Sequence, residues 1–217
     1  MKPIFITGID TGIGKTLVSA ILTQALGADY WKPVQAGREE GTDSEWVRKS
    51  VENPETVIHP ETYLLKQAAS PHIAARSEKR NIDLERILLD FAKIRPGDGP
   101  GDTKFLVIEG AGGLLSPLNE EEFVVDLIRK IRARVILVSR NYLGSINHSL
   151  LTAAVCRQYQ LDVAGWIFND RSLGYEEEIA GWSKFPRIGS IPFAEEITAS
   201  FIRGQAMAMR PLLLNLI

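Results

Sequence analysis

Short runs of apolar residues alternate along this chain with segments in which apolar residues recur at helical spacing. Within residues 83–94 the i, i+3, i+4, i+7 pattern of an amphipathic helix is formed by Leu84, Ile87, Leu88 and Phe91. Residues 105–108 are apolar at every position, which is typical of a strand covered on both faces. The pattern therefore predicts short buried strands separated by helices.

The predicted elements follow one another in the order of an α/β fold. The strands are residues 4–7, 30–34, 105–108, 135–138, 163–168 and 188–191, and the helices are residues 15–26, 83–94 and 145–159. Strands joined by helices form right-handed crossovers, so we expect a mostly parallel central sheet with helices on both faces. Residues 96–102, rich in Gly and Pro, are predicted to be a surface loop. We expect residues 1–217 to form a single domain.

The composition narrows the class of protein. The net charge of −2 and the isoelectric point near 6.0 leave no basic field for a nucleic-acid backbone. Cys156 is the only cysteine, so the chain cannot form an internal disulfide. The N-terminal residues carry no secretory signal, and no apolar run approaches the ~20 residues that span a bilayer. We expect a cytoplasmic protein with neither a nucleic-acid nor a membrane partner.

A phosphate-binding loop follows the first predicted strand. Residues 8–16 read Gly-Ile-Asp-Thr-Gly-Ile-Gly-Lys-Thr, and the first predicted helix begins at Lys15. Backbone N–H groups in such a turn, together with the helix N-terminus, bind phosphate, while Lys15 reaches the β/γ-phosphates and the Thr16 hydroxyl binds Mg²⁺. Five residues instead of four separate Gly8 from Gly14. The motif and its context predict a P-loop nucleotide-binding fold.

The residue at position 10 helps to distinguish among subfamilies of P-loop proteins. Partition and septum-site ATPases have a lysine at the corresponding place of a Lys-Gly-Gly-x-Gly-Lys-Thr loop, which reaches across a dimer. This chain has Asp10, whose charge is opposite. Asp10 cannot stabilise phosphate charge, and it argues against an ATPase that acts as a dimerisation switch.

Three charged residues near predicted strand ends could act with this loop, because ligands of parallel sheets bind at the carboxyl ends of strands. Glu109 directly follows the apolar strand and suits a magnesium ligand. Asp43 precedes an apparent helix, where it is either a metal ligand or a helix N-cap. Lys32 is either a cation in the same crevice or a solvated strand end.

Taken in order, seven stretches resemble the dethiobiotin synthetase family. They are residues 7–16, 32–34, 70–72, 107–113, 143–148, 165–170 and 189–192, and they span almost the whole chain. The most specific are Glu-Gly-Ala-Gly-Gly at 109–113 and Leu-Gly-Ser-Ile-Asn-His at 143–148. The resemblance implies a ligase that builds the ureido ring of dethiobiotin from 7,8-diaminopelargonate, CO₂ and ATP with Mg²⁺. It implies a carbamate, then a mixed anhydride with phosphate, then ring closure.

The resemblance also assigns roles to residues. The metal ligands are Thr16, Asp43 and Glu109, and the catalytic lysines are Lys15 and Lys32. The ATP-binding residues are Gly12, Ile13, Gly14, Lys15, Thr16, Leu17, Asp43, Glu109, Gly110, Ala111, Gly112, Asn169, Asp170, Pro192 and Phe193. Of these, Asn169 would read the adenine edge. The substrate-binding residues are Lys32, Ala36, Gly112, Gly113, Leu143, Gly144, Ser145 and Asn147.

The helix predicted from Ser145 is the expected site for the substrate carboxylate, since a helix N-terminus binds anions. The alternative is that Ser145 only caps its own helix. The resemblance implies that this site lies at the boundary of a homodimer. The chain departs from the family at Ala36, where members often have a hydroxyl residue, and at Tyr142, where some have lysine.

Three alternative functions fit the sequence less well. A cobyrinate-type diamide synthase would need a glutaminase domain with a Cys nucleophile, for which 217 residues leave no room. A regulatory P-loop ATPase would turn over ATP without a second substrate, and Asp10 opposes it. A pure binding module is disfavoured because both phosphate and metal ligands are present.

Overall fold

A parallel sheet forms the centre of the molecule. The computed structural model describes residues 3–39, 41–94, 105–170 and 173–216, and residues 96–102 of the predicted loop lie outside them. Within this part of the chain, seven strands have the order β4-β2-β6-β1-β7-β8-β9, and every neighbouring pair is parallel. Their bounds are β1 Ile4–Gly8, β2 Asp29–Trp31, β4 Ile58–His59, β6 Leu106–Glu109, β7 Arg134–Arg140, β8 Val163–Asn169 and β9 Arg187–Ile191.

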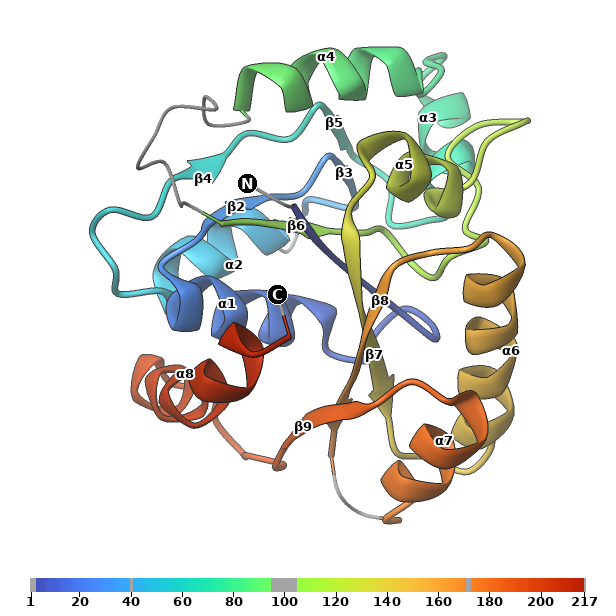
Figure 1. The fold of residues 1–217 in the computed structure, drawn as a ribbon. Helices are drawn as coiled ribbons and strands as arrows, with labels where there is room; N and C mark the ends of the chain where they lie inside the picture. Colours follow the sequence, from blue (N-terminus) through green and yellow to red (C-terminus); the bar gives the residue numbers. More distant parts are fainter. Residues whose placement is uncertain (1–2, 40, 95–104, 171–172, 217) are drawn as a thin grey trace.

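Helices cover both faces of this sheet, as Figure 1 shows. Their bounds are α1 Lys15–Leu26, α2 Asp43–Ser50, α3 Pro71–Ser77, α4 Leu84–Ile94, α5 Val124–Ile131, α6 Ser145–Gln158, α7 Glu176–Ser183 and α8 Ala199–Leu214. Helices α1, α2 and α8 pack on one face, and α4 to α7 pack on the other. Alternate residues of β1 point to opposite faces, so Ile4 and Ile6 enter one core and Phe5 enters the other. The predicted α/β architecture is confirmed.

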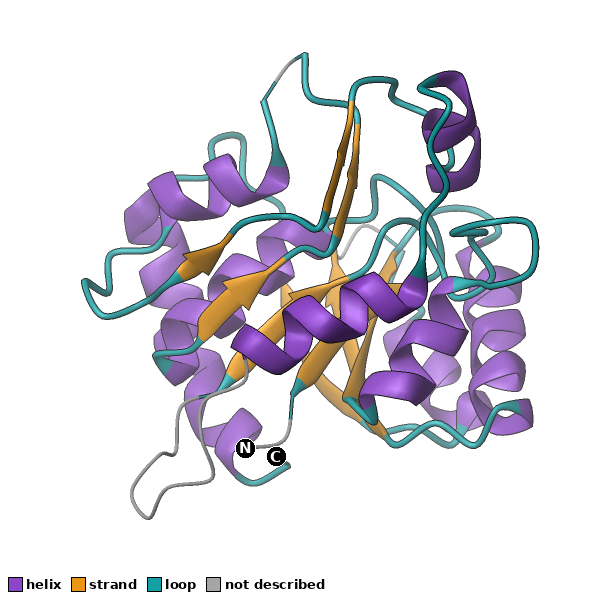
Figure 2. Cartoon of the chain, turned by 90° about the horizontal axis from the view of Figure 1, so that it is seen from above, coloured by secondary structure: helices purple, strands orange, loops and turns teal. Residues whose placement is uncertain are grey.

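The predicted strand at residues 30–34 is wrong in its extent. The structure divides it into β2, which ends at Trp31, and a separate strand β3, Val34–Ala36. Strand β3 pairs with β5, Tyr63–Leu65, in a two-stranded sheet that stands apart from the main one (Figure 2). Pro33 lies at the break, and since proline has no N–H it cannot donate to a ladder. The chain therefore leaves the main sheet at Lys32.

Several elements had not been predicted at all. They are the short strands β4 and β5 and the helices α3, α5, α7 and α8. Helix α8 buries Ile202, Ala206, Met209 and Leu213, whose spacing is helical, and Pro211 within it conceals the pattern. The strands at residues 4–7, 105–108, 135–138, 163–168 and 188–191 and the three predicted helices are confirmed to within one or two residues at each end.

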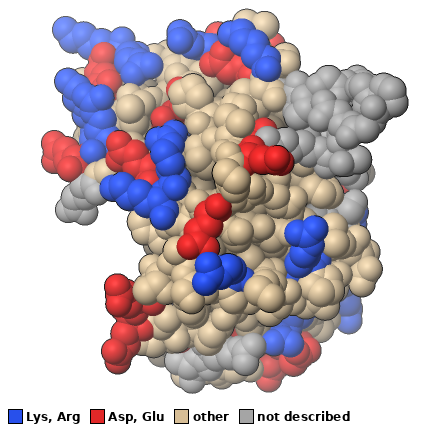
Figure 3. Space-filling view, turned by 90° about the vertical axis from the view of Figure 1, so that its left-hand side faces the viewer, with Lys and Arg blue, Asp and Glu red and all other residues tan. Residues whose placement is uncertain are grey.

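The charge distribution on the surface and the polarity of the helices agree with the mixed composition of the sequence. Lysine, arginine and acidic side chains are interspersed on the face shown in Figure 3. No helix in the described residues has the length and apolar character needed to cross a bilayer.

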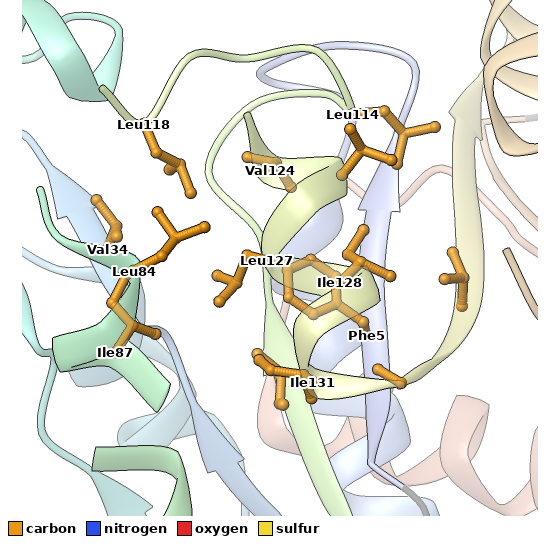
Figure 4. Packing of buried hydrophobic residues seen from close by; sticks show 14 of the residues in the cluster. Phe5, Val34, Leu84, Ile87, Leu114, Leu118, Val124, Leu127, Ile128 and Ile131 are labelled. Carbon is orange, nitrogen blue, oxygen red and sulfur yellow. The ribbon is translucent and has the colours of Figure 1, made fainter. Parts of the chain in front are cut away.

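The larger core lies under α4 and α5. Figure 4 shows Leu84 and Ile87 of α4 in the same cluster as Leu127 of α5, with Ile128 of α5 beside Phe5 of the central strand β1. Leu84 of α4 is 1% exposed within this core, whereas Leu89 of the same helix is 64% exposed. The two leucines therefore provide a matched pair for measuring the contribution of the core.

We predict that Leu84→Ala lowers the free energy of unfolding by about 2–5 kcal/mol, because it leaves a cavity in a packed core. Leu89→Ala should change it by less than about 0.5 kcal/mol. Urea denaturation followed by circular dichroism measures both. Equal effects of the two substitutions would contradict the packing described for α4.

Candidate functional site

The P-loop joins the end of β1 to the start of α1. Gly14 is the N-cap of α1 with φ of 91°, a left-handed conformation that favours glycine. A Cβ atom there would also lie 2.3 Å from Asn169 Nδ2. The Lys15 ammonium folds back over the loop and donates a hydrogen bond to the Asp10 carbonyl at 2.6 Å. The loop thus has the conformation in which backbone N–H groups and one lysine surround an anion.

The Lys15 side chain is buried, and burial lowers the pKa of this lysine to about 8, although the nearby Glu109 carboxylate opposes the shift. Below that pH the ammonium is charged. A buried cation of this kind is stabilised by an anionic ligand such as phosphate.

Four side chains from separate parts of the chain form a closed ring beside the loop. Thr16 Oγ1 lies 3.1 Å from Asp43 Oδ1 and 2.9 Å from Glu109 Oε1. Lys32 Nζ lies 2.5 Å from Asp43 Oδ2 and 2.9 Å from Glu109 Oε1. Lys32 and Glu109 are both buried, so their charges are compensated mainly within the ring.

The electrostatics of the ring favour a charged lysine. Burial alone would lower the pKa of Lys32, but the Glu109 and Asp43 carboxylates outweigh burial, and its pKa is raised. Lys32 is therefore a buried cation between two acids, and the interpretation of Lys32 as a solvated strand end is wrong.

The structure also rejects the N-cap interpretation of Asp43. Thr42 caps α2: its Oγ1 accepts from Glu45 N at 3.1 Å, and the Glu45 carboxylate accepts from Thr42 N at 3.0 Å. Asp43 is the first residue of the helix, and its carboxylate points to Thr16 and Lys32. Because these two reciprocal hydrogen bonds between Thr42 and Glu45 cap the helix, the Asp43 carboxylate is available to the ring.

The oxygens of the ring fit a magnesium ion. Mg²⁺ prefers hard oxygen ligands and is usually held by one or two carboxylates together with substrate phosphates. Thr16, Asp43 and Glu109 supply one hydroxyl and two carboxylates at the P-loop. Among the residues that the structure describes, no group of three or more His, Cys, Asp or Glu side chains could hold a metal alone. The donor set thus suits a metal that arrives with a nucleotide.

A cleft of about 720 Å³ opens over the ring. Its lining includes the P-loop, the ring, Ala36 and residues 68–71. Ala111 and Gly112, which follow β6, also line it, and Gly113 N donates to Ser116 Oγ at 2.9 Å. At Gly110, a Cβ atom would lie 2.8 Å from the Phe5 ring. The cleft is large enough for phosphates and a second small molecule.

A smaller hollow of about 150 Å³ lies on the other side of the P-loop. Its walls include Ile13, Leu17, Asn169, Pro192 and Phe193. Asn169 Nδ2 donates to the Ile13 carbonyl at 2.6 Å, while the buried Asn169 Oδ1 has no partner in the described residues. An apolar hollow with one free acceptor suits a flat ring that carries an amino group.

The rim of this hollow carries an ion pair. Asp170 has φ of 59°, and its carboxylate lies 3.5 Å from the Arg140 guanidinium. Asp170 therefore lines the hollow, and the Arg140 guanidinium compensates its negative charge.

The start of α6 differs in detail from the prediction. Gly144, with φ of 105°, is the N-cap, so the interpretation of Ser145 as a cap is wrong. Ser145 is fully buried, and its Oγ lies 3.4 Å from Tyr142 N. Leu143 and Asn147, by contrast, are exposed. The side chains that face outward from this turn are Leu143 and Asn147.

Two residues that sequence reasoning did not single out contact the ring or its neighbours. Tyr30 on β2 donates its hydroxyl to Glu109 Oε2 at 2.9 Å. Gln35 on β3 donates to the Gly37 carbonyl at 2.9 Å and accepts from Asp43 N at 3.3 Å. One signal in the sequence could have identified Tyr30. It precedes Lys32 by two residues, and residues two apart in an extended chain point to the same face.

Comparisons with known proteins agree in sequence and in fold. The family described as AAA domain matches residues 2–200. The ATP-dependent dethiobiotin synthetase of Cytophaga hutchinsonii is 55% identical over 169 residues, which are 78% of this chain and 77% of the relative. That of Rhodopseudomonas palustris is 42% identical over 203 residues, which are 93% and 91% of the two chains.

Solved structures with the same fold are distant in sequence. The MinC:MinD cell division protein complex of Aquifex aeolicus has a TM-score of 0.59 at 14% identity and covers 100% of this chain and 96% of that chain. The septum site-determining protein MinD of Pyrococcus horikoshii, solved with Mg-ADP, has a TM-score of 0.54 at 14% identity, with coverage of 97% and 89%. At this identity the likeness concerns the P-loop fold alone.

We predict that Lys32→Met lowers the free energy of unfolding by about 3 kcal/mol, because it leaves two carboxylates near a buried site without their cation. Adding Glu109→Gln should restore part of that loss. Lys93→Met, at a lysine whose side chain is 75% exposed, is the control and should cost less than about 0.5 kcal/mol. Urea denaturation measures all three, and equal effects of the two lysine substitutions would refute the buried-charge account.

Proposed function

The chain belongs to the ATP-dependent dethiobiotin synthetase family, and from this premise we propose how its residues carry out the reaction. The observation on which the proposal rests is the ring of Thr16, Lys32, Asp43 and Glu109 beside a P-loop lysine, at the base of one cleft. The enzyme is a carbon–nitrogen bond-forming ligase that uses ATP.

The reaction that we propose has three balanced steps. One amine of 7,8-diaminopelargonate adds to CO₂ and loses a proton, which gives a carbamate. A carbamate oxygen attacks the γ-phosphorus of ATP, and ADP leaves. The second amine then attacks the carbamoyl carbon and loses a proton to solvent, phosphate leaves with the electron pair of the broken C–O bond, and the ureido ring closes. Such a sequence needs positioning and charge stabilisation and no side-chain nucleophile.

The charged residues divide this work. Lys15, held against the Asp10 carbonyl within the loop, offsets charge on the β/γ-phosphates. Lys32 reaches the same cleft and would stabilise the carbamate and the transferring phosphoryl group. Thr16, Asp43 and Glu109 would hold Mg²⁺, which when bound neutralises phosphate charge.

The smaller hollow is proposed as the adenine site. Asn169 Oδ1 would accept a hydrogen bond from the adenine amino group, because Asn169 Nδ2 is already used by Ile13. Pro192 and the exposed Phe193 would flank the base. ATP is a cytosolic co-substrate, so we place the enzyme in the cytoplasm.

The first turn of α6 is proposed to bind the substrate carboxylate at the boundary of a homodimer. The N–H groups of a first helical turn lack intrahelical acceptors and carry partial positive charge. Asn147 and the backbone would bind the acid, while the exposed Leu143 would contact the aliphatic chain. Ser145 is buried in the structure, so its contribution would be to fix the turn through Tyr142.

A regulatory ATPase is the second candidate, because the P-loop lysine and the oxygens of the ring would also serve ATP hydrolysis. Such a switch would hydrolyse ATP at a steady rate without diaminopelargonate. A synthetase would not, which separates the two functions in one assay.

We predict that the purified protein converts 7,8-diaminopelargonate, bicarbonate, ATP and Mg²⁺ into dethiobiotin, detected by mass spectrometry. Lys15→Ala should lower the rate by on the order of 10²-fold or more, because it removes a cation that stabilises transferring charge. Lys93→Ala is the exposed control and should retain the wild-type rate. No dethiobiotin from the wild type would overturn the proposed function, and a Lys15→Ala rate within a few-fold of wild type would overturn the role of Lys15.

We predict that Asn147→Asp raises the KM for diaminopelargonate by roughly tenfold, because like charges near a surface repel by about 1–4 kcal/mol at 4 Å. The KM for ATP should stay unchanged. Gln158→Glu adds the same charge at the far end of α6 and should affect neither constant.

Sedimentation should show a dimer at micromolar concentration. A fully active monomer would refute a shared site.

A further inference from the structure

The two carboxylate oxygens of Glu109 have different surroundings. Oε1 lies 2.9 Å from both the Thr16 hydroxyl and the Lys32 ammonium, on the side of the P-loop. Oε2 lies 2.9 Å from the hydroxyl of Tyr30, on the side of the core. The carboxylate is thus held from both ends, and only one of its oxygens is turned toward the cleft.

The sheet explains why Tyr30 can reach Glu109. Tyr30 on β2 is paired in register with Val107 on β6, and both side chains enter the core that lies under α1. Glu109 follows Val107 by two residues and therefore projects from the same face. The tyrosine ring spans this offset and delivers its hydroxyl to the carboxylate. Tyr30 is fully buried, so water cannot take its place.

The identity of the partner also has a consequence. A hydroxyl donates one hydrogen bond without adding a charge, so it orients the carboxylate and leaves its negative charge for a cation in the ring. Without that donor, Oε2 of a side chain that is 1% exposed would lose its Tyr30 partner, and the carboxylate would be held at Oε1 alone.

We propose that Tyr30 is a positioning residue that fixes Glu109 so that Oε1 alone faces the magnesium site. The inference rests on the proposed function in one respect, which is that Glu109 is a metal ligand. Partners that orient metal ligands typically change metal affinity by 10–100-fold when they are removed.

The test measures magnesium binding and does not depend on turnover. MgCl₂ is titrated into protein mixed with the fluorescent nucleotide N-methylanthraniloyl-ADP, and the Mg²⁺ concentration at half-saturation is read from the fluorescence. We expect Tyr30→Phe to raise it by about tenfold. Binding of the nucleotide without Mg²⁺ should stay within twofold of wild type. Tyr63→Phe is the matched control, because Tyr63 is also buried and its hydroxyl accepts from Asp83 N at 3.0 Å, away from the ring.

A double-mutant cycle distinguishes positioning from a general structural role. If Tyr30 acts through Glu109, then Tyr30→Phe should have less than a twofold effect in the Glu109→Gln background. Additive effects of the two substitutions, or a Tyr30→Phe value within twofold of wild type, would overturn the inference and leave the proposed function intact. A wild-type protein whose nucleotide binding ignores Mg²⁺ would overturn the metal role of Glu109 and the inference together.

A second variant at position 30 tests the inference if Tyr30→Phe does not fold. If circular dichroism shows that Tyr30→Phe is unfolded, p-aminophenylalanine is introduced at position 30, where it keeps a weaker donor of the same reach. Its half-saturation should exceed that of wild type and should lose this difference in the Glu109→Gln background. A value equal to wild type would count against the inference.

Discussion

The burial of Glu109 at the end of β6 is the constraint on which the site depends. A carboxylate that is 1% exposed is stable as an anion only with cations and donors around it. Thr16 on α1, Tyr30 on β2 and Lys32 directly after β2 meet that need. The positions of β2, the P-loop and the chain after Trp31 are therefore fixed relative to one another by one charge, and under the proposed function the same charge would serve the metal.

The parallel sheet makes this convergence possible. Strands β1, β2 and β6 are neighbours that end at the same edge, so residues distant in sequence meet there. The departure of the chain at Pro33 adds a second wall, because β3 and β5 form a separate pair above that edge (Figure 2). Gln35 links this wall to Asp43. The cleft is thus formed by a break in a strand, not by the sheet alone.

The sequence predicted those parts of the fold that depend on local pattern. Runs such as residues 105–108 and the Gly-Lys turn carry their conformation in adjacent residues, so β6 and the start of α1 lie where they were expected. The division of residues 30–34 depends on Pro33 and on a partner strand 29 residues away, which no local pattern contains. The contact of Tyr30 with Glu109 depends on the register of β2 against β6, and only the folded sheet defines it.

The same reasoning explains how the structure decides between alternatives that the sequence leaves open. Asp43 could cap a helix or join a metal site, and both interpretations used the same residue type at the same place. Thr42 takes the capping role because its own hydroxyl reaches Glu45 N, and a helix needs only one such cap. With the helix satisfied, the Asp43 carboxylate can turn to Lys32, which lies in a buried place where an unpaired ammonium would be costly. The assignment of one residue thus follows from the needs of its neighbours.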